Sequence, residues 1–197
     1  MWSVPQALAT LTLIAFGAIP VIIVAGVWQR VVSAAVPART TPLGRVWAHG
    51  RDSALGLAWV AALVATLGSL YLSEIAHYPP CTLCWLQRIA MYPLVVVLGI
   101  GAIRDDRDVR WYALPLAGIG AGLAFYHALL QRVPSLQQST SCSADAPCNV
   151  MWLREFGFVS IPVMALGAFL LIAVLLLVGA TAAAGDVAES GRNRRGR

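Results

Sequence analysis

The sequence predicts an all-α integral membrane protein with five transmembrane helices. Of its 197 residues, 59% are hydrophobic and only 12% are charged, and the mean hydropathy is +0.74. Soluble domains are about 25% charged, so this composition is typical of a protein that lies in a bilayer. Five long apolar runs are separated by short segments that carry nearly all of the 14 basic residues, and every one of these is arginine. At roughly 20 residues per crossing, five helices leave no room for a separate soluble domain.

The first apolar run, Ala7–Trp28, is long enough to span a membrane. No basic residue precedes it, whereas a cleavable signal peptide normally begins with positive charge and ends at a small-residue cleavage site. We therefore expect a retained helix. Residues 29–52 contain four arginines and two prolines, a composition that predicts a linker.

The second predicted span is Ser53–Ser73, followed by a short loop, Glu74–Pro80. The third apolar run, Ile89–Ile103, covers only about 22 Å at 1.5 Å per residue, which is too short for a bilayer. We therefore expect the third helix to begin near Cys84 and to hold Arg88 within its first turns.

The fourth and fifth spans follow a charged turn, Arg104–Arg110. They are predicted at Trp111–Gln131 and at Phe156 to about Thr181. A polar loop, Arg132–Glu155, connects them, and the chain ends in a basic tail at residues 182–197.

Arginine positions predict the orientation of the chain. The linker, the charged turn and the tail together hold eleven arginines, and the segments on the other side hold three. Positive charge on short flanking segments marks the cytoplasmic side. Five alternating spans therefore place the amino terminus and both cysteine-containing loops outside the cytoplasm and the tail inside it. Arginines in these positions also argue against a nucleic-acid-binding patch.

Four cysteines form two close pairs, Cys81 with Cys84 and Cys142 with Cys148. In a Cys-x-x-Cys motif at the start of a helix, one thiolate attacks a foreign disulfide and the other resolves the mixed disulfide. The helix amino terminus and the nearby Arg88 both favour a thiolate. Two alternatives remain open at this point: the pairs are static disulfides, or they form a four-thiolate zinc site.

Arg88 and His127 are candidate ligands of a quinone, because both are expected at the outer interface at the depth of Cys84. Their side chains could hydrogen-bond quinone oxygens and stabilise charge on the reduced ring. Alternatively, Arg88 extends to the lipid headgroups and His127 bonds a neighbouring helix carbonyl. A membrane quinone is the expected electron acceptor, since no nucleotide fingerprint or haem-attachment motif occurs in the chain.

Several motifs resemble the disulfide bond formation protein B (DsbB) family, in particular its Gram-positive, BdbC-type branch. They are Gly68-Ser-Leu-Tyr-Leu-Ser-Glu74, Pro80-Cys-Thr-Leu-Cys-Trp-Leu-Gln-Arg88, Met91-Tyr-Pro93, Phe156-Gly-Phe158 and Ile161-Pro162. The resemblance covers roughly residues 57–177. It implies a four-helix transmembrane bundle at residues 53–181, preceded here by one additional helix with its linker at residues 1–52.

The same resemblance implies a function. Members of the family oxidise a DsbA-like thioredoxin-fold partner and pass two electrons to ubiquinone or menaquinone in the bacterial inner membrane. By position, Cys81 and Cys84 match the quinone-proximal pair, Arg88 the quinone-site arginine, and His127 a histidine near the quinone. The partner would attack Cys142, Cys148 would attack Cys81, and Cys84 would react with the quinone. The short spacing of the second pair departs from the proteobacterial branch. Vitamin K epoxide reductase-like proteins run similar chemistry, but with the two pairs in the opposite order.

Overall fold

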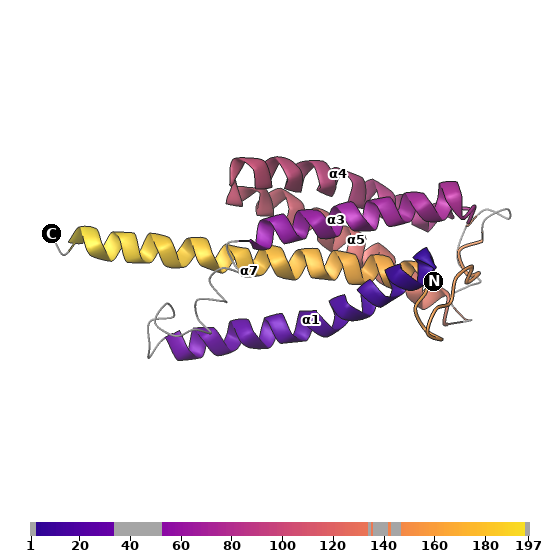
Figure 1. The fold of residues 1–197 in the computed structure, drawn as a ribbon, viewed down its shortest axis with the longest axis horizontal. Coiled ribbons are helices and arrows are strands. Elements are labelled where there is room, and N and C mark those ends of the chain that lie inside the picture. Colours follow the sequence, from indigo (N-terminus) through magenta and orange to yellow (C-terminus); the bar gives the residue numbers. More distant parts are fainter. Residues whose placement is uncertain (1–2, 34–52, 134, 136–141, 143–146, 196–197) are drawn as a thin grey trace.

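The computed structural model describes residues 3–33, 53–133, 135, 142 and 147–195 (Figure 1). Within these residues, five helices are long and apolar enough to cross a membrane, which confirms the predicted fold class. They are α1 (Val4–Ser33), α3 (Ala54–Leu70), α4 (Thr82–Arg104), α5 (Arg110–Leu130) and α7 (Ile161–Arg195). A π-helical turn, η2 (Tyr71–Ile75), extends α3, and a short 3-10 turn, η3 (Arg107–Val109), joins α4 to α5.

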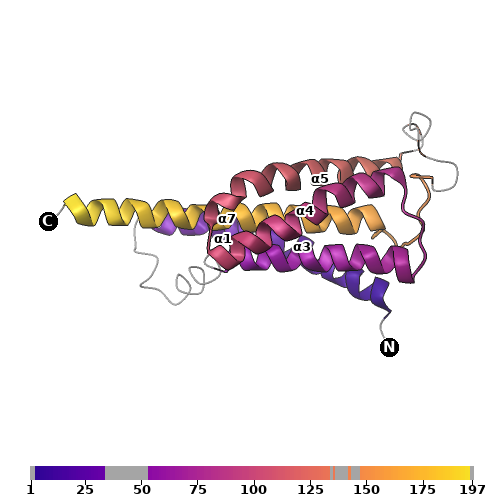
Figure 2. The same ribbon diagram turned by 90° about the horizontal axis from the view of Figure 1, so that it is seen from above.

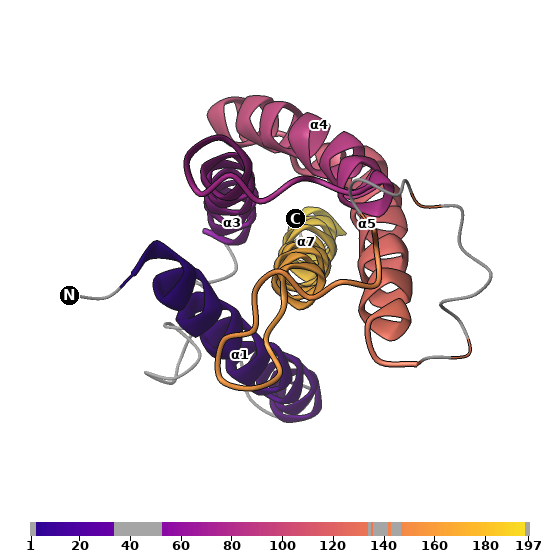
Figure 3. The same cartoon turned by 90° about the vertical axis from the view of Figure 1, so that its right-hand side faces the viewer.

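Helix α7 forms the centre of the bundle. Seen end-on, α3, α4 and α5 form an arc around α7, and α1 lies on the side of α7 that this arc leaves open (Figure 3). The amino terminus lies at the same end of the bundle as the segments that carry the cysteines, and the carboxyl terminus lies at the opposite end (Figure 1). The fold therefore places the amino terminus and the two cysteine pairs at the same end of the bundle, as predicted.

The structure confirms one predicted helix start and corrects another. Helix α4 begins at Thr82, near Cys84 as predicted, because the Sγ atom of Cys81 accepts a hydrogen bond from the backbone N–H of Cys84 and caps the helix. Helix α7 begins at Ile161 and not at Phe156.

The late start of α7 has a local cause. Glu155 and Val159 exchange two backbone hydrogen bonds, both of 3.0 Å, across a tight turn. The turn needs positive φ angles at Phe156 (51°) and Gly157 (80°), and a helix cannot pass through that conformation.

The carboxyl-terminal ends of the two longest helices, α1 and α7, also differ from the predicted ends. Helix α1 continues to Ser33, over the first residues of the predicted linker, while residues 34–52 lie outside the described residues. Helix α7 runs on through the predicted basic tail to Arg195 and projects beyond the other helices (Figure 2).

Small residues allow the helices to approach closely, as is usual inside membranes. The buried side chains Ala58, Ala62, Ala113, Ala117 and Ala124 form much of the core, together with Phe169 and Ile172 from α7. A β-carbon at Gly120 on α5 would collide with the ring of Phe169, and one at Gly99 on α4 would stand 2.9 Å from Nε1 of Trp59. These glycines set the contact of α5 with α7 and of α4 with α3.

Gly120→Ala is therefore expected to destabilise the protein by about 1–3 kcal/mol through overpacking against Phe169. Gly118→Ala is the matched control on the same helix, because a β-carbon there meets nothing within 4 Å. Thermal unfolding in detergent should show a lower midpoint for Gly120→Ala and an equal or higher midpoint for Gly118→Ala. Equal midpoints would mean that α5 and α7 do not depend on this contact.

Candidate redox-active site

The first cysteine pair stands at the amino terminus of α4. Cys81 is the residue that caps the helix, and Cys84 lies in its first turn. Their Sγ atoms are 2.8 Å apart, and both residues are free thiols. Because the backbone N–H groups at a helix amino terminus carry partial positive charge, this position favours a thiolate.

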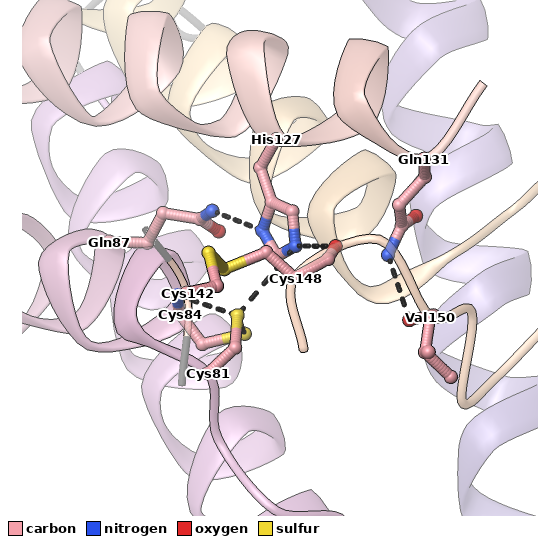
Figure 4. The surroundings of a disulfide bond; sticks show 8 residues. All are labelled: Cys81, Cys84, Gln87, His127, Gln131, Cys142, Cys148 and Val150. Atoms are coloured by element: carbon pink, nitrogen blue, oxygen red, sulfur yellow. Dashed lines mark hydrogen bonds between the residues drawn. A yellow bond between two sulfur atoms is a disulfide. The ribbon is translucent and has the colours of Figure 1, made fainter. Parts of the chain in front are cut away.

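The second pair is joined as a disulfide, with 5.9 Å between the Cα atoms of Cys142 and Cys148. Figure 4 shows this disulfide beside Cys81 and Cys84. Cys148 is buried against Cys81 and Leu130, whereas Cys142 is only partly buried. Of the two loop cysteines, Cys142 is thus the one that an incoming thiol can reach more easily.

His127 connects the two pairs. The side chain comes from α5, is only 2% exposed, and holds its Nε2 atom 3.1 Å from the backbone oxygen of Cys148 and 3.7 Å from Sγ of Cys81 (Figure 4). Since a carbonyl oxygen can only accept, Nε2 carries the hydrogen and donates it. The other ring nitrogen, Nδ1, then accepts from Nε2 of Gln87 at 3.0 Å. Gln87 thereby fixes the tautomer that directs an N–H group toward Cys81.

These contacts lower the pKa of Cys81 from 9.0 to about 4. The largest cause is the hydrogen bond from the Cys84 thiol, which outweighs the opposing effect of burial. The hydrogen bonds from His127 and from the backbone N–H of Cys84 lower the pKa further. In the reduced protein, Cys81 is the thiolate of the first pair.

The low pKa of Cys81 gives an expected pH dependence. Because the folded value lies below the ordinary value, thiolate formation stabilises the folded, reduced protein fully above pH 9, and this contribution is lost as the pH falls through about 4. In a Cys142→Ser, Cys148→Ser background, the ultraviolet absorbance of the thiolate should persist to about pH 5. His127→Phe should shift the titration to higher pH, and His127→Gln, which keeps an N–H donor, should shift it less. A titration near pH 9 in the parent protein would contradict this assignment.

Arg88 points from α4 toward α3. Its Nε–H donates to the hydroxyl of Ser69 and an Nη2–H donates to the backbone oxygen of Ser69, both at 2.9 Å. The guanidinium group also lies over the ring of Trp85, 5.1 Å from its centroid. The side chain is only 7% exposed, so it is held inside the bundle and does not extend to the surface.

An apolar cavity of about 480 Å³ reaches this site. Its polar end is formed by Cys81, Cys84, Gln87, Arg88 and His127, and the rest is lined mainly by apolar side chains of α1, α3 and α7. The hydroxyl of Tyr92, which also lines the cavity, is buried and has no hydrogen-bond partner among the described residues. A quinone needs hydrogen-bond donors for two carbonyl oxygens and apolar space for its ring and tail, and these residues fit such a group.

The structure thus brings five of the six predicted site residues into contact or into one cavity, namely Cys81, Cys84, Arg88, His127 and Cys148, with Cys142 bonded to the last of them. Sequence reasoning missed Gln87, Ser69 and Tyr92. The first had a signal, because Gln87 stands three residues after Cys84 and so shares its helix face. Tyr92 had the same signal, because it stands four residues after Arg88 on the same helix face, whereas Ser69 had none of this kind.

Cys81, Cys84 and His127 could also hold a metal ion, since their ligand atoms lie within 4.8 Å of one another. The four-thiolate zinc site considered from the sequence is not formed in this state, because Cys142 and Cys148 are bonded to each other. A metal site would therefore use one pair and the histidine.

A free thiol pair at the mouth of a transmembrane helix, beside a second pair in a disulfide, defines a membrane thiol–disulfide oxidoreductase. The chain belongs to the DsbB family: residues 51–179 match the family model described as "Disulfide bond formation protein DsbB". No solved structure shows significant similarity to it.

Named relatives agree with this assignment. "Disulfide bond formation protein C" of Bacillus subtilis (strain 168) is 48% identical over 118 residues, which are 60% of this chain and 86% of the relative. "Probable disulfide formation protein C 1" of Bacillus anthracis is 45% identical over 124 residues, which are 63% of this chain and 89% of the relative. A "Probable disulfide formation protein" of Coxiella burnetii (strain CbuK_Q154) is 41% identical over 129 residues, or 65% and 88% of the two chains. The family match begins at residue 51, so α1 lies outside it.

Proposed function

We propose that the protein is a quinone-dependent oxidase that reoxidises an extracytoplasmic, DsbA-like thioredoxin-fold partner. The observation that carries the proposal is the cavity that connects Cys84 and Arg88 with the apolar interior between α3 and α7. A lipid-soluble acceptor can enter such a cavity directly from the bilayer. When bound there, a quinone accepts two electrons and two protons and becomes a quinol.

The four cysteines would transfer electrons by successive disulfide exchange. A partner thiolate attacks Sγ of Cys142, and the bond to Cys148 breaks. Cys148 then attacks Cys81 of an oxidised first pair and releases Cys84 as a thiolate. The partner's second thiolate completes the partner's own disulfide and frees Cys142.

Cys142 next attacks Cys148, which restores the loop disulfide and releases Cys81. The N–H of His127 stabilises the departing Cys81 thiolate, because it lies 3.7 Å from that sulfur. Cys81 and Cys84 now hold the two electrons, and giving them up re-forms their disulfide. Arg88 and the hydroxyl of Tyr92, which line the same cavity, would bind the acceptor's oxygens. The sequence-based role of His127 as a direct quinone ligand stays a prediction.

Orientation and organisation complete the proposal. The excess of arginine in the linker, the α4–α5 turn and the tail supports a cytoplasmic carboxyl terminus and extracytoplasmic cysteines in the bacterial cell membrane. We divide the chain into an additional helix with its linker at residues 1–52, the catalytic bundle at 53–181 and the basic tail at 182–197.

The test uses the purified full-length protein, a reduced thioredoxin-fold substrate, and a ubiquinone or a menaquinone analogue. Loss of quinone absorbance that requires the reduced substrate would support the proposal. Chelator treatment is the control for the metal alternative, since a redox pair should be insensitive to it. Absence of reduction with both analogues would overturn the proposal.

A further inference from the structure

We propose that α1, the helix outside the family match, forms a wall of the quinone site and binds the isoprenoid tail of the quinone. This inference rests on the proposed function, but it concerns a part of the chain that the family does not share. It assigns to α1 a role in the selection of the acceptor and not only in membrane anchoring.

The cavity is long and follows α1 through most of the membrane. The α1 side chains that line it include Leu8, Leu11, Thr12, Ala15, Ala18 and Ile22. From Leu8 to Ile22 the helix rises about 21 Å, at 1.5 Å per residue. Apolar residues of α3 and η2, from Leu57 to Leu72, line the facing wall over a similar length. A flexible apolar chain fits this shape, whereas a compact ligand would occupy only part of it.

Space in this groove comes from small side chains and from the tilt of α1. Ala15 and Ala18 on α1 face a lining that includes Ala61 and Ala65 on α3. Near its amino terminus α1 approaches α3, where a β-carbon at Gly68 would stand 2.9 Å from Cδ2 of Leu8. Farther along, α1 leans away from α3 (Figures 1 and 3), and its contacts with α7 include Thr12 and Phe16 against Gly167. The gap between the two helices widens toward the opposite end of the bundle.

The polar groups of the groove indicate which kind of molecule binds there. The same cavity contains Cys84, the buried Arg88 and the unpartnered hydroxyl of Tyr92. A molecule that fills the cavity needs a polar, redox-active head at these groups and an apolar tail along α1. A membrane quinone has this construction. The acyl chain of a phospholipid, whose headgroup stays at the bilayer surface, is the competing occupant that the experiment must distinguish.

The groove also has an opening toward the lipid. Leu11 on α1 and Leu57 and Val60 on α3 line the cavity and are each about half exposed. A long tail can therefore pass between α1 and α3 and leave the protein there. The site does not have to enclose the whole tail.

Ala18→Phe tests the inference, because it places a ring inside the groove far from the cysteines. We expect the KM for a long-tailed quinone to rise about tenfold or more. The KM for a short-tailed quinone analogue, which has one isoprenoid unit, should stay within about twofold, because only the long tail loses apolar contact. Ala7→Phe is the matched control, since Ala7 is exposed on the same helix and does not line the cavity. It should change neither constant.

Ala61→Phe on α3 fills the same groove from the opposite wall and should give the same selective effect. An equal rise in the KM for both quinones would overturn the role of α1. No change in either KM would overturn it as well, and this is the result expected if a phospholipid chain fills the groove. Turnover with the short-tailed analogue shows that each variant is folded. If the unmodified protein reduces neither quinone, it is the proposed function that fails, and the two failures are therefore distinguishable.

Discussion

Cys84→Ser should abolish catalytic turnover while it leaves a single round of chemistry intact. The Cys142–Cys148 disulfide can still be attacked, so each protein molecule should oxidise about one equivalent of reduced partner and then stop. Without Sγ of Cys84 the first pair cannot re-form its disulfide, and steady-state quinone reduction should fall by at least about a thousandfold.

The measurement is a burst experiment that follows partner oxidation and quinone absorbance together. Cys142→Ser is the informative control, because it removes the sulfur assigned to the partner and should abolish the burst as well. Normal turnover in Cys84→Ser would remove Cys84 from the electron route. Absence of the burst would mean instead that the partner does not enter at the loop disulfide.

Arg88→Ala should raise the KM for quinone roughly 10- to 100-fold and should change the KM for the partner much less. The range corresponds to the loss of a hydrogen bond from a charged donor, about 1.5–3 kcal/mol. The guanidinium group can serve the cavity because two of its N–H groups already hold it against Ser69, which fixes its direction.

Two variants separate the contribution of the Arg88 charge to the KM for quinone from the contribution of its hydrogen-bonded geometry. Ser69→Ala keeps the charge but removes the hydroxyl that accepts from Nε, and it should give a smaller increase in the KM for quinone. Arg88→Lys also keeps the charge but loses the forked geometry, so it should fall between the wild type and alanine. A larger effect on the KM for the partner than on that for quinone would favour a purely structural role of Arg88.

The five membrane spans could be predicted from the sequence because each depends on local composition over about 20 residues. The start of α4 could be predicted only as near Cys84, since the cap that Cys81 provides depends on the direction of one side chain. The start of α7 was placed five residues early for a different reason. Phe156 and Phe158 are apolar and were counted with the span, but the turn they flank is set by backbone hydrogen bonds between Glu155 and Val159.

At the candidate site, the cysteines, Arg88 and His127 could be found from the sequence. Their contacts could not, because Ser69 and His127 come from other helices than Arg88 and Gln87, and the hydrogen bonds between them depend on how α3 and α5 pack against α4. The position of α1 in the bundle could not be predicted from the sequence for the same reason. Its apolar sequence indicates a membrane helix, but its place against α7 and over the cavity depends on small residues such as Gly68 and Gly167, which are distant in sequence.

The cap of α4 has a consequence for how the protein responds to its own chemistry. In the proposed mechanism the sulfur of Cys81 exchanges disulfide partners, and in the structure the same sulfur accepts the hydrogen bond that starts a membrane-crossing helix. Each time this atom changes from a thiolate to a covalently bonded sulfur it becomes a weaker acceptor, and the first turn of α4 loses part of its support. The proposed electron flow would thereby be coupled to the backbone at the entrance of the bundle, at the end of the helix that also carries Arg88.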